Sequence, residues 1–222
     1  MELFTSDDRM DRIESGGWGF SIFRGRLPLG IILIHEIKGI DEYALSVGKR
    51  LSNEGYWVVI PDLFRGISAN SLEEGMKLRD ALTREEAIDA MSRGLDILRE
   101  KTGGPRIGTM GFCMGGGFAL LGACNLKIDF CVDYYGMIEN AKELEGLIGP
   151  LQLMLGSEDK RVTPWALKSL MPAVVEHRKR ADVHLYPNAG HAFHRPGWHG
   201  HEPVAAKDAW TKTLLFLRER LE

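Results

Sequence analysis

Residues 105–125 read PRIGTMGFCMGGGFALLGACN, and this stretch decides the fold class. The segment from Pro105 to Cys113 predicts a strand, and MGGGFALLGACN predicts a helix that follows it directly. Only a very tight turn can join the two, and Gly111 and Gly115 flank that turn without a Cβ that would strike neighbouring backbone. Strand, sharp turn and helix in this order predict an α/β protein.

The rest of the chain repeats the alternation of short apolar runs and amphipathic stretches that is typical of a largely parallel sheet. The predicted buried strands are GIILIH (30–35) and YWVVIPDLF (56–64). Further strands are predicted in IDFCVDYY (128–135), in LQLMLGSED (151–159) and in ADVHLYPNAG (181–190), which also contains the exit loop of the last strand. The predicted helices are Asp41–Asn53, Ser71–Ala81, Thr83–Lys101, Pro164 to about Arg180, and Pro203–Leu221. Since no break resembles a domain boundary, we expect one α/β domain over residues 1–222, with helices on both faces of the sheet.

Two segments carry more specific expectations. GWGFSIFRG (17–25) alternates with the two-residue period of a half-exposed strand, which favours an antiparallel pair at the edge of the sheet. The last helix offers an apolar face made of Val204, Trp210, Leu214, Leu215 and Leu217.

Composition excludes several classes of protein. The 222 residues are 44% hydrophobic and 27% charged, as in an ordinary globular protein, and the net charge of −3 gives no basic excess for nucleic acid. The first residues lack the order of a secretory signal, and the apolar runs are too short to cross a bilayer, so we expect a soluble cytoplasmic protein without a membrane partner. Three cysteines form no disulfide framework or four-thiolate zinc site, which leaves free thiols for catalysis.

Cys113 is the candidate nucleophile, because G-F-C-M-G matches the G-x-nucleophile-x-G pattern of the α/β-hydrolase elbow. At the start of a helix, unpaired N–H groups and the positive end of the dipole favour a thiolate, and the N–H of Met114 can serve as an oxyanion donor. The alternative is a buried cysteine beside glycines that only allow close packing. Cys124 and Cys131 lack the motif and are expected in the core.

In an α/β-hydrolase the acid and the histidine follow the nucleophile along the chain, each in a loop after a strand. Asp159 follows LMLG as the predicted acid, with Glu158 as its nearest rival, and His191 follows ADVHLYPNAG as the predicted base. We expect Asp159 to orient His191 through one ring nitrogen, so that the other faces Cys113. Four further histidines compete with His191: His184 inside a strand, and His194, His199 and His201 in an apparent surface loop.

The clustered histidines near His191 also raise the possibility of a metal site. Their spacing matches no known ligand pattern, so we expect neither a metal nor another cofactor. After the strand GIILIH, Glu36 is expected beside the nucleophile, where a partly desolvated carboxylate could exchange a proton with the thiol. The N–H of Ile37 is expected to be the second oxyanion donor.

Taken together, these motifs resemble the dienelactone hydrolase family of α/β-hydrolases. The resemblance spans nearly the whole chain and is carried by ILIHEIKG (32–39), GYWVVIPDLF (55–64), MGFCMGGG (110–117), GSEDKRVTP (156–164) and YPNAGHAFHR (186–195). It implies a triad of Cys113, Asp159 and His191, with Glu36 near a largely protonated thiol and taking its proton once substrate binds. It also implies that Arg195 binds a substrate carboxylate. A second substrate arginine has no clear match, Arg65 and Arg79 being loose candidates.

The predicted activity is therefore hydrolysis of a small, anionic lactone or ester through a thioester on Cys113. One alternative is a general carboxylesterase or thioesterase with the same fold. Another is a catalytically silent binding protein, and a redox role is disfavoured because Cys113 has no resolving cysteine beside it.

Overall fold

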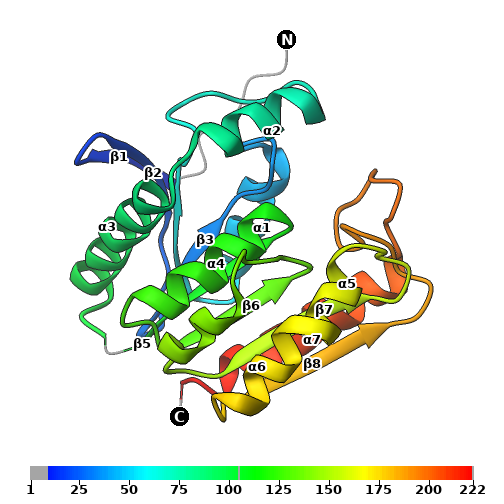
Figure 1. The fold of residues 1–222 in the computed structure, drawn as a ribbon. Coiled ribbons are helices and arrows are strands. Elements are labelled where there is room, and N and C mark those ends of the chain that lie inside the picture. The colour runs from blue at the N-terminus through cyan, green and yellow to red at the C-terminus, as the bar shows by residue number, and fades with distance from the viewer. Residues whose placement is uncertain (1–9, 105, 222) are drawn as a thin grey trace.

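The computed structural model describes residues 10–104 and 106–221, and an eight-stranded sheet runs through its centre (Figure 1). Across the sheet the strands are β1 (Met10–Ser15), β2 (Trp18–Phe23), β4 (Trp57–Pro61), β3 (Leu29–Ile34), β5 (Arg106–Phe112), β6 (Phe130–Tyr134), β7 (Leu151–Gly156) and β8 (Ala181–Tyr186). The six strands from β4 to β8 pair in parallel, whereas β2 pairs antiparallel with both β1 and β4. This α/β-hydrolase sheet confirms the predicted fold class. Pro105, at the predicted start of β5, lies outside the described residues.

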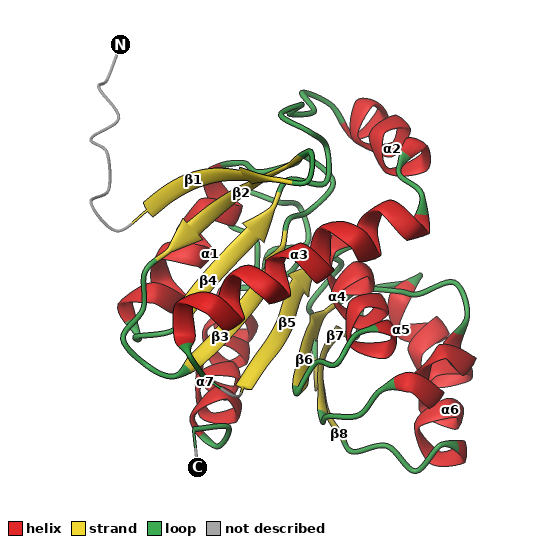
Figure 2. Ribbon diagram, turned by 90° about the vertical axis from the view of Figure 1, so that its left-hand side faces the viewer, coloured by secondary structure: helices red, strands yellow, loops and turns green. Residues whose placement is uncertain are grey.

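Helices cover both faces of the sheet, as Figure 2 shows. They are α1 (Glu42–Asn53), α2 (Leu72–Ala81), α3 (Arg84–Thr102), α4 (Met114–Asn125), the 3₁₀ helix η1 (Ala141–Gly146), α5 (Val162–Trp165), the π-helical turn η2 (Ala166–Leu170), α6 (Met171–Glu176) and α7 (Pro203–Arg218). α3 and α4 pack on the face opposite to α1 and α7. Within residues 10–104 and 106–221, none of the helices has the length and apolar character needed to cross a bilayer.

Both faces of β2 are covered, so the expectation of a half-exposed strand is wrong. The Phe20 ring lies next to Gly94 of α3, and the Phe23 ring lies over Gly48 of α1 on the other side of the sheet. Five of the six residues of β2 are buried as a result. The predicted antiparallel pairing is confirmed, because the more exposed β1 is the true edge and shields β2.

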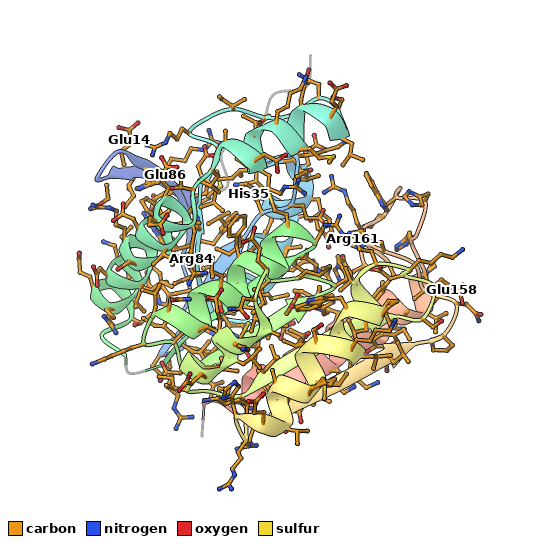
Figure 3. All side chains as sticks on the ribbon, viewed as in Figure 1. Glu14, His35, Arg84, Glu86, Glu158 and Arg161 are labelled. Carbon is orange, nitrogen blue, oxygen red and sulfur yellow. The ribbon has the colours of Figure 1, made fainter. Side chains whose placement is uncertain are left out.

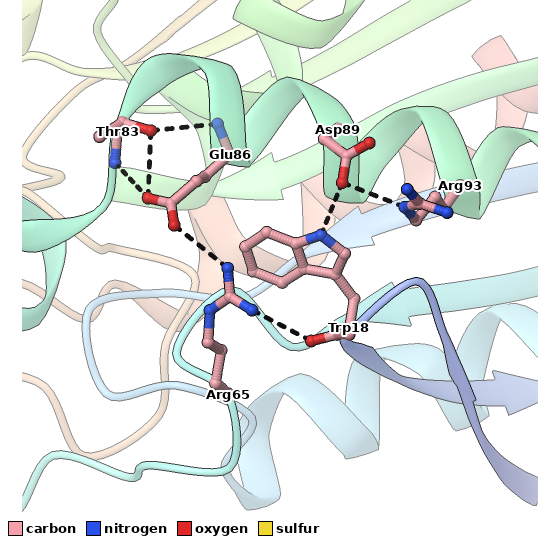
Figure 4. A network of polar contacts seen from close by, with 7 residues as sticks. Trp18, Arg65, Thr83, Glu86, Asp89 and Arg93 are labelled. Atoms are coloured by element: carbon pink, nitrogen blue, oxygen red, sulfur yellow. Dashed lines mark hydrogen bonds and ion pairs between the residues drawn. The ribbon is translucent and has the colours of Figure 1, made fainter.

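A network of polar contacts fastens α3 to the β1–β2 hairpin (Figure 4). Thr83 begins the helix in a capping box with Glu86, as the sequence TREE predicts. The Glu86 carboxylate also binds Arg65, whose guanidinium lies 3.9 Å from the centre of the Trp18 ring. The Trp18 indole N–H donates to Asp89 one turn further along α3. Local capping and long-range packing therefore support the same arrangement.

The helix predicted from Pro164 to about Arg180 is shorter than expected. It is built from α5, the π-helical turn η2 and α6, and it ends at Glu176. Arg178 adopts a left-handed conformation, with φ of 51°, which is incompatible with a continuing right-handed helix.

The predicted apolar face of α7 is also partly wrong. Val204 and Leu215 are 76% and 53% exposed, whereas Leu217 is buried as expected. The buried side of the helix is formed mainly by small residues, such as Ala205 and Ala209, which let α7 lie close to the sheet. Hydrophobicity alone does not identify this close-packed side.

Candidate active site

Cys113 occupies a strained turn between β5 and α4. Its φ and ψ are 54° and −119°, and its backbone N–H donates to the Tyr134 carbonyl at 2.9 Å. A Cβ at Gly111 would lie 2.0 Å from the Gly115 carbonyl oxygen, and one at Gly115 would lie 2.3 Å from the Ile34 carbonyl oxygen. The two glycines are therefore required by close backbone packing, which presents the Cys113 side chain at the carboxyl end of the sheet.

The structure brings Cys113, His191 and Asp159 together from the ends of three strands. The Cys113 Sγ lies 2.9 Å from His191 Nε2, and His191 Nδ1 lies 2.6 Å from Asp159 Oδ2. The other carboxylate oxygen of Asp159 accepts the backbone N–H groups of Arg161 and Val162 at 3.0 and 2.9 Å. A sulfur, an imidazole and a fixed carboxylate thus form a continuous hydrogen-bonded chain.

The hydrogen bonds that link Cys113, His191 and Asp159 shift the pKa values of the imidazole and the carboxylate in opposite directions. Burial alone would raise the pKa of Asp159, but hydrogen bonds from His191 and from two backbone amides outweigh it and lower that pKa. Burial alone would lower the pKa of His191, yet its bonds to Asp159 and Cys113 raise it overall. The arrangement therefore favours a protonated imidazole hydrogen-bonded to an ionised carboxylate.

The rival acid and most of the rival histidines lie elsewhere. Glu158 is exposed, and Figure 3 shows it extending outward from the molecule. His184 lies within β8, as predicted. His199 and His201 line a surface pocket next to His191 and Asp159, but it is His191 that contacts the sulfur. Cys124 and Cys131 are buried, and burial raises the pKa of the Cys124 thiol to about 12.

His194 is not in a surface loop, so that expectation is wrong. It is only 4% exposed, and its Nδ1 lies 2.6 Å from the Tyr43 hydroxyl. Its ring packs among Phe112, Tyr134 and Trp210. Burial lowers the pKa of His194 to about 3, which keeps the ring neutral at ordinary pH. The Arg, Pro and Gly residues of the loop after β8 indicated an exposed segment, but the loop folds back over the core at His194.

No group of three or more His, Cys, Asp or Glu side chains is placed to hold a metal ion in the described ranges 10–104 and 106–221. His201 instead pairs its Nδ1 with the Phe193 carbonyl at 2.8 Å. The histidines that suggested a ligand cluster in the sequence are thus directed to different neighbours.

Glu36 and Arg195 form an ion pair at the site, and Arg195 also binds Asp41. Burial raises the pKa of Glu36, an effect that Arg195 only partly offsets. The Cys113 sulfur is hydrogen-bonded to His191, whereas Glu36 Oε2 accepts a hydrogen bond from Arg195. Arg195 is therefore placed among the candidate site residues, with its charge balanced by two carboxylates.

The loose candidates for a second substrate arginine have other partners. Arg65 binds Glu86 and stacks on Trp18, and Arg79 binds its neighbour Asp80 at 2.6 Å. Neither is paired with the groups around Cys113.

The two predicted oxyanion donors lie on segments that touch. Met114 is the first residue of α4, where a backbone N–H has no partner within the helix. Ile37 follows β3, and the carbonyls of Ile34 and His35 just before it pack against Gly115 of the elbow. The segments that carry the two N–H groups therefore adjoin the Cys113 turn.

Three neighbours of these residues were not predicted from the sequence. Asp41 was expected only as the start of a helix, yet it both caps α1 and binds Arg195. Tyr43 links His194 to this region, with the Arg195 guanidinium 4.8 Å from its ring. Tyr135 has φ of 45°, faces His191 edge-on at 5.4 Å, and is 1% exposed. In the sequence, the only sign that Tyr135 could lie near the site was its position at the end of the predicted strand 128–135.

Comparison with known proteins places this chain in a family. A curated Bradyrhizobium sp. protein named "Probable 2-oxo-3-(5-oxofuran-2-ylidene)propanoate lactonase" is 28% identical over 99% of this chain and 98% of its own length. A Saccharolobus solfataricus protein named "Putative carboxymethylenebutenolidase" is 28% identical over 86% of this chain and 89% of its own. The crystal structure of a dienelactone hydrolase-like promiscuous phosphotriesterase from metagenomic libraries superposes with a TM-score of 0.82 at 19% identity, covering 95% of this chain and 97% of that one. The family model described as "Dienelactone hydrolase family" matches residues 24–221, and the chain belongs to that family.

Proposed function

We propose that this protein is a carboxylic ester hydrolase that opens small lactones or esters, with Cys113 as nucleophile, His191 as base and Asp159 as the group that orients the base. The observation that carries the proposal is the hydrogen-bonded chain from the Cys113 sulfur to His191 (2.9 Å) and on to Asp159 (2.6 Å) at a strained elbow. The lactonase and carboxymethylenebutenolidase names of the relatives support this substrate class.

The reaction proceeds in two halves. The Cys113 thiolate attacks the ester carbonyl carbon, and the carbonyl electron pair moves to the oxygen, which accepts the N–H groups of Ile37 and Met114. Collapse breaks the carbon–oxygen bond of the ester, the leaving oxygen takes a proton from His191, and a thioester remains. His191 then removes a proton from water, which attacks the thioester and releases the acid together with the thiolate. In a lactone the leaving oxygen stays tethered to the product.

Substrate charge can be coupled to activation of the thiol through Arg195. A substrate carboxylate that binds Arg195 competes with Glu36, whose raised pKa makes it ready to accept a proton once its ion pair is broken. Glu36 then takes the proton of the Cys113 thiol when that thiol is still protonated. A small anionic substrate would in this way promote its own hydrolysis.

The direct test is replacement of Cys113. Cys113→Ala should abolish turnover of a dienelactone and of 4-nitrophenyl acetate, and Cys113→Ser should leave only slow turnover because an alcohol is a weaker nucleophile than a thiolate. Cys124→Ala is the matched control, since Cys124 is buried elsewhere in α4 and should leave the rate unchanged. Unchanged turnover by Cys113→Ala would refute the assignment, and failure of the wild type to hydrolyse any ester would favour a silent binding protein.

A second candidate is a general carboxylesterase that prefers neutral substrates. It is favoured by the ion pairs of Arg195 with both Glu36 and Asp41, which leave no unbalanced positive charge for a substrate carboxylate. Matched pairs of neutral and anionic esters separate the candidates. Higher kcat/KM for the anionic member, lost in Arg195→Met, supports the first proposal, and the reverse order supports the second.

A further inference from the structure

His35 is a buried titratable residue for which the proposed reaction has no use. It follows β3 directly, is 1% exposed, and lies within the body of the molecule beneath α2 in the view of Figure 3. Its Nε2 lies 3.2 Å from the backbone N of Leu63, and its Nδ1 lies 2.8 Å from the carbonyl oxygen of Glu36. Both ring nitrogens therefore contact backbone groups.

These two contacts define which nitrogen carries the proton. The Leu63 N–H can only donate, so Nε2 must accept and be unprotonated. The Glu36 carbonyl can only accept, so Nδ1 must carry the hydrogen and donate it. Burial lowers the pKa of His35, which also favours this neutral form. The ring is thus a bridge between the loop after β4 and the loop after β3.

The bridge holds one particular peptide unit. The Glu36 carbonyl belongs to the same planar trans peptide as the Ile37 N–H, so the two bonds point in opposite directions. That carbonyl also accepts the Gly39 N–H at 3.1 Å. With the oxygen tied to His35 and Gly39, the Ile37 N–H must face the other way and cannot rotate without breaking both hydrogen bonds.

The next two peptide units contact α2 and the segment before it. Gly75 is the buried residue of α2, and a Cβ there would lie 2.3 Å from the Ile37 carbonyl oxygen. The Ala69 N–H donates to the Lys38 carbonyl at 3.1 Å. The loop after β3 is therefore fixed by backbone contacts with α2 and the segment before it, as well as by the hydrogen bond from His35.

We propose that His35 is a positioning residue, whose ring orients the Ile37 N–H toward the oxyanion formed at Cys113. The proposal rests on the proposed function, because it assigns the Ile37 N–H to the oxyanion of the cysteine adduct. The residue acts through the backbone and touches no substrate atom.

The test compares two variants of the full-length protein. His35→Phe removes both ring nitrogens at similar volume, and His35→Asn keeps a donor near the Nδ1 position for the Glu36 carbonyl. Loss of one oxyanion donor lowers kcat by about 100- to 1000-fold, so a misdirected one should lower kcat by about tenfold or more in His35→Phe, with little change in KM. His35→Asn should recover most of that loss. His184→Phe in β8 is the matched control and should keep the wild-type kcat.

A second readout separates oxyanion positioning from general damage. Alkylation of Cys113 by iodoacetamide needs the thiolate but forms no oxyanion, so its rate should be unchanged in His35→Phe even where ester hydrolysis falls. Unchanged kcat in His35→Phe, or a parallel fall in alkylation and hydrolysis in both variants, would overturn the proposal. Failure of the proposed function itself would look different, because the wild type would then form no thioester on Cys113 that mass spectrometry detects.

Discussion

The carboxylate of Asp133 should make the stability of this protein depend on pH in an unusual direction. Asp133 is the penultimate residue of β6, packs against Gly116 of α4, is fully buried, and accepts one hydrogen bond, from the Gly136 N–H at 2.8 Å. Its other oxygen has no hydrogen-bond partner among residues 10–104 and 106–221. Burial raises the pKa of Asp133 from 3.8 to about 7 despite that bond. The folded protein therefore prefers the neutral acid.

The sign and size of the effect follow from the raised pKa. The contribution of the neutral acid is fully present below the unfolded pKa of 3.8 and is lost as the pH rises through about 7. At about 1.4 kcal/mol per pH unit, the loss between pH 5 and the folded pKa of about 7 is about 3 kcal/mol, and the loss levels off by pH 8. Asp133→Asn is neutral at every pH and should escape this loss.

Urea unfolding at pH 5, 6, 7 and 8 measures the difference in unfolding free energy between the wild type and Asp133→Asn. That difference should shift by about 3 kcal/mol in favour of the variant over this range, whatever its starting value. Other titrating groups cancel because they are common to both proteins. A difference that stays constant with pH would show that Asp133 is ionised in the folded state, and the reasoning from burial would be wrong.

Three further predictions concern Gly115 of the elbow, the pairing of Asp159 with His191, and the hydroxyl of Tyr134. Gly115→Ala should lower the unfolding free energy by about 2–3 kcal/mol, because its Cβ would meet backbone at 2.3 Å. Gly94→Ala in α3, where the nearest contact of the new Cβ is at 3.5 Å, should instead raise the unfolding free energy by about 0.5–1 kcal/mol. Equal effects of the two substitutions in thermal melts would contradict this. Asp159→Asn should reduce kcat by about ten-thousandfold and lower the pKa of His191, which would move the pH–rate profile. An unmoved profile would exclude the coupling between Asp159 and His191. Tyr134→Phe should lower the unfolding free energy by about 1 kcal/mol by breaking its 2.8 Å bond to Thr213, and an unchanged unfolding free energy in urea titrations would contradict this.

Much of the fold was predictable because local signals and packing agree. The apolar run of β3 is buried throughout, and the caps at Ser71 and Thr83 begin α2 and α3 as their sequences indicate. The elbow was predictable for a stronger reason, since its two glycines answer a steric requirement visible in the sequence.

The contacts that were missed depend on distant partners. Nothing local distinguishes His194, which is buried because Tyr43, about 150 positions away, supplies its hydrogen bond. Arg195 is paired with Asp41 because the loop after β8 returns to the start of α1. The side of α7 that faces the sheet was misjudged because alanines allow closer approach than leucines. Each miss reflects tertiary packing that overrides the local pattern.

The elbow also separates the sulfur of Cys113, the proposed nucleophile, from the backbone that presents it. Close backbone contacts at Gly111 and Gly115 leave no room for other side chains, whereas residue 113 needs only a short side chain that tolerates φ of 54°. Exchange of sulfur for oxygen there alters one atom and no backbone contact. Distant homologues should accordingly keep glycines at the positions of Gly111 and Gly115, while the residue at position 113 can differ between them.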